Sequence, residues 1–162
     1  MAGKTVWIVG GATGFGAEIS KYYWRTGWNV CISSSDQDKI SQFCSDLADN
    51  RPNQFIYGCA LDLAHHDRYE STIEKILENS PVDLLIVTAA ISNAFSPPRP
   101  MLEGSLERYQ KYLDVNAIGP WNLTRSLFSL VDKDQAELSV IYFTSKAAWA
   151  CSTSACAASR PP

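Results

Sequence analysis

Short apolar runs alternate with amphipathic segments along most of the chain. Five runs have the length typical of strands covered on both faces; they occupy residues 6–9, 29–33, 55–61, 83–89 and 139–144. The segments between them have helical spacing, and in one of these the apolar residues at i, i+3, i+4 and i+7 are Ile40, Phe43, Cys44 and Leu47. Strict alternation of strand and helix predicts a parallel sheet with right-handed crossovers and helices on both faces.

Start and stop signals place the helices more closely. The buried face of the first helix, over residues 14–26, is expected to carry Ile19, Tyr22 and Tyr23. The next helix begins near residue 36, with Asp36 or Ser35 as its N-cap. A proline-rich loop at 96–100 separates the fourth strand from a single long helix over about 106–130.

Four glycines follow the first strand directly and open the first helix. They are Gly10, Gly11, Gly14 and Gly16. Glycine permits a tight turn and a close approach of pyrophosphate to the backbone, and the first N–H groups of a helix bind such an anion. A tight structural turn is the alternative, but the position between strand and helix favours nucleotide binding. The chain is therefore predicted to form an α/β, doubly wound, Rossmann-type domain of about five parallel strands.

The end of the second predicted strand bears on cofactor choice. NAD-binding domains of this type place an acidic residue there to hold the ribose 2′-hydroxyl, but this sequence has Ser33-Ser34-Ser35. Serine hydroxyls suit a 2′-phosphate, although no arginine accompanies them. The expected cofactor is NAD(P), with a slight preference for NADP.

Composition limits the number of domains and the kinds of partner that the chain could have. The chain has 162 residues, 46% of them hydrophobic, which suffices for one core. We expect an NAD(P)-binding domain over residues 1–148 and an irregular tail over 149–162. The net charge is −3 and the 14 Lys and Arg are scattered, so no nucleic-acid partner is expected. No apolar stretch reaches the roughly 18 residues of a membrane span, and a cytoplasmic protein is predicted.

The cysteines and histidines do not predict a metal site. The five cysteines are odd in number and show no CxxC spacing, which favours reduced, mostly buried thiols. The adjacent His65 and His66 are expected in a polar loop.

The glycine-rich segment resembles the turn of the short-chain dehydrogenase/reductase family, and the resemblance extends over about residues 5–145. Residues 10–16, GGATGFG, look like the family's TGxxxGxG turn, with Val9 where the threonine stands. The same turn also aligns as Gly11-x-x-Gly14-x-x-Ala17, which resembles the longer, epimerase-like members of the superfamily. Both alignments imply the same fold and cofactor class.

Three downstream segments add to the resemblance. Asp62-Leu63 is similar to the pair that contacts the adenine. Residues 83–90, DLLIVTAA, look like the strand that ends in NNAG, but with VTAA, which implies weaker side-chain hydrogen bonding at the central sheet. The closest match is residues 114–124, DVNAIGPWNLT, where Asn116 falls on the family's catalytic asparagine. The residues that the resemblance places at the cofactor are Gly10, Ala12, Thr13, Gly14, Phe15, Gly16, Ser34, Ser35, Asp62, Leu63, Ala89 and Ala90.

The implied catalytic set is incomplete. In this family a serine after the fifth strand polarises the carbonyl, and a Tyr-x-x-x-Lys on the next helix supplies the acid/base. Ser145 is the candidate serine and acts beside Asn116. The tyrosine is expected near residues 157 and 158, which are alanines here.

A second string, residues 142–148 with the sequence YFTSKAA, resembles the family's YxxSKAA motif and would make Tyr142 and Lys146 catalytic. Residues four apart lie about 5–6 Å from each other on a helix but about 13 Å apart on a strand. The β-branched and aromatic content of residues 138–144 favours a strand. Tyr142 is therefore interpreted as a sheet residue and Lys146 as a solvated charge, with catalysis by this pair as the alternative.

Two functions remain open. One is an NAD(P)-dependent oxidoreductase that moves a hydride between nicotinamide and a small carbonyl or alcohol substrate. The other is a nucleotide- or partner-binding module without catalysis, which the absent tyrosine favours. The resemblance also implies a fold that is C-terminally truncated relative to the family. Exposed apolar edges would follow, with association into a homo-oligomer or poor solubility as the expected consequence.

Overall fold

A five-stranded parallel sheet forms the centre of the computed structural model, which describes residues 3–49, 51–91, 105–131 and 137–144. The strands are β1 (Thr5–Val9), β2 (Asn29–Ser34), β3 (Ile56–Ala60), β4 (Leu84–Val87) and β5 (Ser139–Tyr142). Their spatial order is β3-β2-β1-β4-β5, and every neighbouring pair is parallel. The predicted doubly wound fold is confirmed. The predicted boundary at residue 148 and the predicted tail lie outside the described residues.

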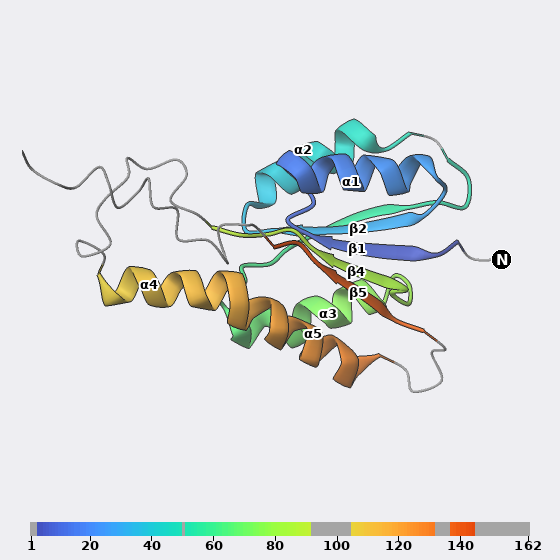
Figure 1. Cartoon of the computed structure of the whole chain (residues 1–162). Coiled ribbons are helices and arrows are strands. Elements are labelled where there is room, and N and C mark those ends of the chain that lie inside the picture. The colour runs from blue at the N-terminus through green and yellow to red at the C-terminus, as the bar shows by residue number, and fades with distance from the viewer. Residues whose placement is uncertain (1–2, 50, 92–104, 132–136, 145–162) are drawn as a thin grey trace, which may run out of the picture.

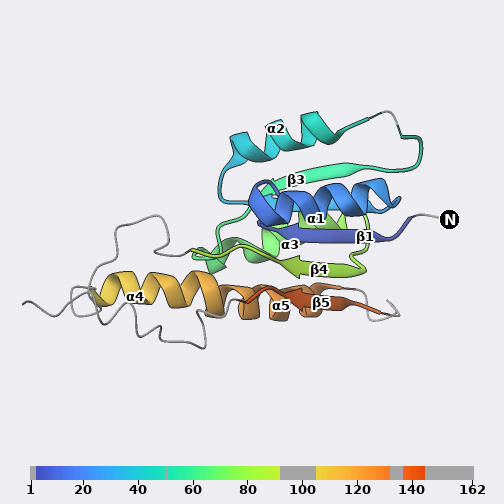
Figure 2. The ribbon, with the colours of Figure 1, turned by 45° about the horizontal axis from the view of Figure 1, so that its top comes forward.

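Helices cover both faces of this sheet (Figure 1). One layer holds α1 (Gly14–Arg25) and α2 (Gln37–Leu47). The other holds the 3-10 turn η1 (His66–Arg68), α3 (Tyr69–Leu77), α4 (Leu106–Leu113), η4 (Asp114–Ile118) and α5 (Gly119–Leu130). The expected single helix over 106–130 is continuous but contains a π-helical turn, η4, and Figure 2 shows α4 and α5 following one another beside β5.

The apolar run of β1 serves both faces, because successive strand residues point to opposite sides. Val6 and Ile8 belong to the core under α1 and α2, whereas Trp7 and Val9 belong to the core against α3 and α5. All four side chains are at most 1% exposed. The absence of polar positions in this run is thus explained by its central place in the sheet.

The buried face of α1 agrees only in part with the sequence prediction. Gly16, Ala17, Ser20 and Trp24 are buried, and Tyr22 is 62% exposed. The Ser20 hydroxyl donates to the carbonyl oxygens of Gly11 and Gly16, at 3.0 and 2.9 Å. Small residues occupy most of this face because the helix packs closely on the turn that precedes it. Ile19 and Tyr23 are half-buried against the same core as Trp24, and only Tyr22 of the three predicted residues is exposed.

The cap of α2 is confirmed, while β3, β4 and β5 are shorter than predicted. Asp36 Oδ1 accepts the N–H groups of Asp38 and Lys39, at 3.1 and 3.2 Å. Strands β4 and β5 end at Val87 and Tyr142, two residues before the predicted ends. The chain leaves β4 after Val87, and the N–H groups of Thr88 and Ala89 both donate to the Val9 carbonyl.

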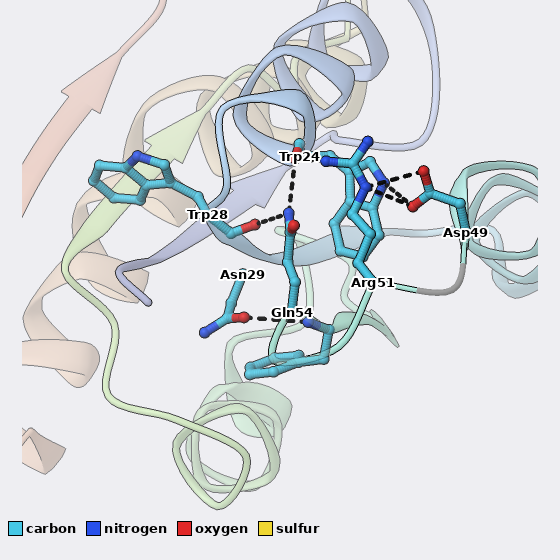
Figure 3. A network of polar contacts seen from close by, with 7 residues as sticks. Trp24, Trp28, Asn29, Asp49, Arg51 and Gln54 are labelled. Atoms are coloured by element: carbon cyan, nitrogen blue, oxygen red, sulfur yellow. Dashed lines mark hydrogen bonds and ion pairs between the residues drawn. The ribbon is translucent and has the colours of Figure 1, made fainter. Parts of the chain in front are cut away.

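A polar network closes the opposite, amino end of the sheet (Figure 3). Gln54 Nε2 donates to the carbonyl oxygens of Trp24 and Trp28, at 2.7 and 2.6 Å. Arg51 donates to both carboxylate oxygens of Asp49, and Asp49 Oδ1 also accepts the Trp24 indole N–H at 3.0 Å. These contacts satisfy the carbonyls at the end of α1 and fix the connection from α2 to β3.

The described cysteines are free thiols, as expected. Cys31 and Cys59 are buried and Cys44 is half-buried. Burial, with smaller contributions from Cys59 and Cys44, raises the pKa of Cys31 to about 12. This thiol therefore stays protonated and unreactive at neutral pH.

No helix within the described ranges is long and apolar enough to span a membrane.

Tyr69 offers a test of the packing between α3 and the loop after β3. It is fully buried, and its hydroxyl donates to the Leu63 carbonyl at 2.7 Å. Tyr69→Phe leaves that buried acceptor without its close donor, so we expect a loss of about 1–2 kcal/mol in the free energy of unfolding, measured by urea denaturation. The exposed Tyr22→Phe is the control and should stay within about 0.5 kcal/mol of the parent. Equal midpoints for both variants would contradict this role.

Candidate functional site

A cleft of about 390 Å³ lies at the carboxyl ends of the strands, within the size range of ligand pockets, about 300–1,000 Å³. The parallel register aligns Val9 with Ser33 on one side and Val87 on the other, so the loops that follow these strands meet at one edge. The chain order reverses between β1 and β4, and such switch points are where doubly wound folds bind ligands. The cleft is lined by Val9, Gly10, Thr13, Phe15, Gly16, Ser34, Ser35, Leu61, Asp62, Leu63, Thr88, Ala89, Ala90, Ile91, Lys111, Val115 and Phe143.

Two glycines of the turn are required by its geometry. Gly10 has φ +87°, and a Cβ there would lie 2.7 Å from the Ala89 nitrogen. At Gly16 a Cβ would overlap the Gly10 carbonyl oxygen. The turn, the start of α1 and the end of β4 are thus in direct backbone contact, which only glycine at these positions allows.

The turn leaves hydrogen-bond donors open at the start of α1. Thr13 is the N-cap residue, but its side chain makes no capping bond. The first N–H groups of the helix, from Gly14 to Gly16, have no intrahelical acceptor by geometry. They border a cleft lined by Thr13, Phe15 and Gly16, and such donors suit an anionic group such as phosphate.

The end of β2 presents hydroxyl groups and no carboxylate to the cleft. Ser34 and Ser35 line it. The next residue, Asp36, is turned to the start of α2, where it caps the helix and pairs with Lys39 Nζ at 2.8 Å. The hydrogen bond from Lys39 lowers the pKa of the Asp36 carboxyl.

Most predicted cofactor residues meet in this one cleft. Gly10, Thr13, Phe15, Gly16, Ser34, Ser35, Asp62, Leu63, Ala89 and Ala90 all line it. Ala12 and Gly14 belong to the turn but do not line the cleft; Ala12 is 8% exposed and packs in the core under α1 and α2. Contact of these residues with a cofactor remains a prediction.

Sequence reasoning missed part of the opposite wall. Lys111, Val115, Ile91 and Phe143 line the cleft from the other helical layer and from the residue after β5. Lys111 lies four residues before Val115, and Val115 precedes Asn116 in the motif that the sequence comparison singled out. Helical spacing counted back from Val115, four residues toward the N-terminus, was therefore the available signal for Lys111.

Asn116 occupies the π-helical turn η4 and holds the loop after β4. Its Oδ1 accepts the Ile91 N–H, and its Nδ2 donates to the Ile91 carbonyl, each at 2.8 Å. The π-helical turn interrupts regular α-helical bonding at this point, as is common at functional sites. Asn116 thus positions Ile91, which lines the cleft, rather than lining the cleft itself.

Tyr142 lies on β5, as the strand interpretation predicted. Its hydroxyl is 2.5 Å from Thr124 Oγ1 on α5. Phe143 points to the other side of the sheet, where its ring packs edge-on against Phe15 with centroids 4.9 Å apart. Tyr142 does not line the cleft, whereas Phe143 does. Ser145 and Lys146 lie outside the described residues, so the catalytic set stays a prediction.

A family model described as short chain dehydrogenase matches residues 4–159. The chain belongs to this family. Short-chain dehydrogenase/reductase ATR9 of Stachybotrys chlorohalonatus is 27% identical over 73% of this chain and 47% of that protein. Xanthoxin dehydrogenase of Arabidopsis thaliana is 29% identical over 74% of this chain and 41% of its own length.

Solved structures of the family share the fold. A 3-oxoacyl-[acyl-carrier protein] reductase from Brucella melitensis in complex with NAD superposes with a TM-score of 0.77, at 19% identity, over 94% of this chain and 59% of that chain. Serine dehydrogenase from Escherichia coli gives a TM-score of 0.75 at 22% identity, over 90% of this chain and 64% of that one. The chain spans about half the length of the curated relatives it matches.

The close contact between Gly16 and Gly10 can be tested by adding a methyl group at position 16. Gly16→Ala forces apart the turn and the start of α1, and overpacking of this kind costs about 1–3 kcal/mol. Because the displaced N–H groups border the cleft, we expect the affinity for NAD⁺ and NADP⁺, measured by calorimetry, to fall by roughly tenfold or more.

Gly27→Ala is the matched control. Gly27 has φ +89° and open space around its Cβ position, away from the cleft. Alanine there should cost about 1–2 kcal/mol of stability, seen as a lower melting temperature, with unchanged affinity. Equal losses of affinity in the two variants would mean that general destabilisation, not the turn, governs binding.

Proposed function

We propose that this chain is the nucleotide-binding part of an NAD(P)-dependent oxidoreductase that transfers a hydride between nicotinamide and a small carbonyl or alcohol substrate. The observation that carries the proposal is the cleft at the switch point, where the glycine turn, the end of β2 and the Asp62-Leu63 pair lie together. Membership of the short chain dehydrogenase family supports it.

The donor set fits a dinucleotide. The open N–H groups at the start of α1 would hold the pyrophosphate, and Asp62 with Leu63 would hold the adenine. Asp62 Oδ1 already accepts the Ala64 N–H at 2.9 Å, which fixes its carboxylate at the cleft. When bound, the nicotinamide would supply or accept the hydride. Phe15 and Phe143 would form an apolar wall that keeps water from the reacting groups.

The catalytic residues that the family resemblance implies are Asn116, which lies on η4, and Ser145. Ser145 would polarise the substrate carbonyl, and Asn116 would keep the loop after β4 in place through its two bonds to Ile91. Tyr142, the alternative proton donor, has its hydroxyl bonded to Thr124 on the α5 side of the sheet.

That same bond favours a second candidate, a nucleotide-binding module without turnover. In this alternative Tyr142 only joins β5 to α5, and the chain binds NAD(P) without reducing a substrate. A turnover assay separates the two functions.

The assay follows the loss of reduced-nicotinamide absorbance with NADPH or NADH and a panel of aldehydes and ketones. The parent is expected to oxidise cofactor, and Ser145→Ala to lower kcat by about a hundredfold. A parent that binds cofactor by calorimetry but oxidises none would establish the second function instead.

Thr124→Val is the control for Tyr142→Phe, because both remove the hydrogen bond between the two side chains and only Tyr142→Phe removes the phenolic hydroxyl. A structural Tyr142 predicts unchanged turnover in both variants and a small loss of melting temperature in each, larger for Thr124→Val because Thr124 Oγ1 also donates to the Pro120 carbonyl. Loss of turnover confined to Tyr142→Phe would assign the proton transfer to Tyr142.

We further propose a preference for NADP over NAD. The support is the pair of serines at the end of β2 together with the engagement of the next residue, Asp36, in the cap of α2. Hydroxyl and backbone donors at the end of β2, which itself presents no carboxylate to the cleft, suit a 2′-phosphate.

Ser35→Asp tests this preference. A carboxylate beside the 2′-position repels the phosphate of NADP⁺ and accepts from the 2′-hydroxyl of NAD⁺, so the NADP⁺ affinity should fall by roughly tenfold while that for NAD⁺ holds or rises. Ser45→Asp, exposed on α2, is the charge-matched control and should leave both affinities unchanged. Equal effects on the two cofactors would contradict recognition of the 2′-phosphate at this serine.

A further inference from the structure

Lys111 extends one wall of the cleft from the helical layer opposite the glycine turn. It lies on α4, one helical turn before Val115, and both line the cleft. Residues four apart share a helix face, and helical side chains lean toward the N-terminus. Val115 is 7% exposed and belongs to the core, whereas Lys111 is exposed, so the lysine stands at the outer rim above that core contact.

The charge balance of the cleft depends on this lysine. The charged side chains among the lining residues are Asp62 and Lys111. Asp62 accepts the Ala64 N–H and lies 3.8 Å from His65 Nε2. The glycine turn offers neutral N–H donors alone, and Lys111 is the one full positive charge in the lining described here.

The ammonium group of Lys111 is also available to bind a ligand. Its neighbours on the same helix are engaged with each other: Arg108 donates to the Tyr112 hydroxyl, and Gln110 donates to Asp114. Across the described part of the chain, Lys111 itself makes no ion pair and no side-chain hydrogen bond. A lysine held at the mouth of a cleft without a partner is suited to an anionic ligand.

We propose that Lys111 is a phosphate-binding residue of the nucleotide site, acting from the wall opposite the glycine turn. The proposal rests on the proposed function, because it takes the ligand to be a dinucleotide. The start of α1 and Lys111 belong to helices on opposite faces of the sheet, which converge on the same edge (Figure 1). The turn would thus bind phosphate oxygens through N–H groups, and Lys111 would supply the compensating charge from the far side.

Calorimetric titration of the whole chain with adenosine, ADP, NAD⁺ and NADP⁺ tests the proposal. Lys111→Met keeps the apolar stem and removes the charge, and it is expected to weaken ADP and both dinucleotides by about five- to tenfold without changing adenosine. Lys111→Arg should restore most of that affinity. Added salt should weaken ADP binding to the parent more than to Lys111→Met, since screening acts on the removed charge.

Lys75→Met, on the exposed surface of α3, is the control and should bind every ligand as the parent does. Equal loss for adenosine and ADP in Lys111→Met would assign the lysine to packing and overturn the proposal, as would unchanged ADP binding. A parent that binds none of the four ligands would instead overturn the proposed function, which keeps the two failures distinct.

Discussion

The carbonyl oxygen of Val9 holds the site together. It accepts the N–H groups of Thr88 and Ala89 and the Thr88 hydroxyl, at 2.9, 3.0 and 3.0 Å. These bonds pull the end of β4 against the last residue of β1, just where the glycine turn begins. That approach leaves no room for a Cβ at Gly10 or Gly16. The Thr88 hydroxyl thus supplies one side-chain hydrogen bond at the central sheet, where the VTAA segment was expected to give weaker side-chain hydrogen bonding. A backbone contact between two strands therefore dictates the glycines, the start of α1 and the shape of the cleft.

The cleft combines contributions from two helical layers that the sheet keeps apart elsewhere. The α1 layer contributes neutral N–H donors and hydroxyls, through the glycine turn and the two serines after β2. The layer of α4, η4 and α5 contributes Val115 and Lys111 directly and Asn116 through Ile91. At the carboxyl edge of the strands, residues of both layers line the same cleft. Tyr142, the last residue of β5, and Phe143, which follows it, divide in the same way, because Tyr142 contacts α5 and Phe143 contacts Phe15.

Local patterns in the sequence were sufficient for the fold and for much of the cleft. The apolar runs, the cap at Asp36 and the glycines after β1 are short-range signals, and each depends on backbone geometry within a few residues. Two of the errors concern contacts between one element and another. Tyr22 was expected in the core, but contact with the glycine turn selects the small face of α1. The helix over 106–130 gave no sign of the π-helical turn, which accompanies the bonds between Asn116 and Ile91.

By itself the sequence determined the class of the protein, because alternating periodicities and a glycine-rich strand-to-helix turn admit one parallel, doubly wound arrangement. Which side chains share the cleft was decided by the tertiary structure alone. Lys111 and Asp62 are far apart in the chain and line one cavity, while Tyr142 and Phe143 are adjacent and face opposite layers. The physical reason is that strand pairing sets the register of the carboxyl ends, and that register brings together loops with no local sequence relationship.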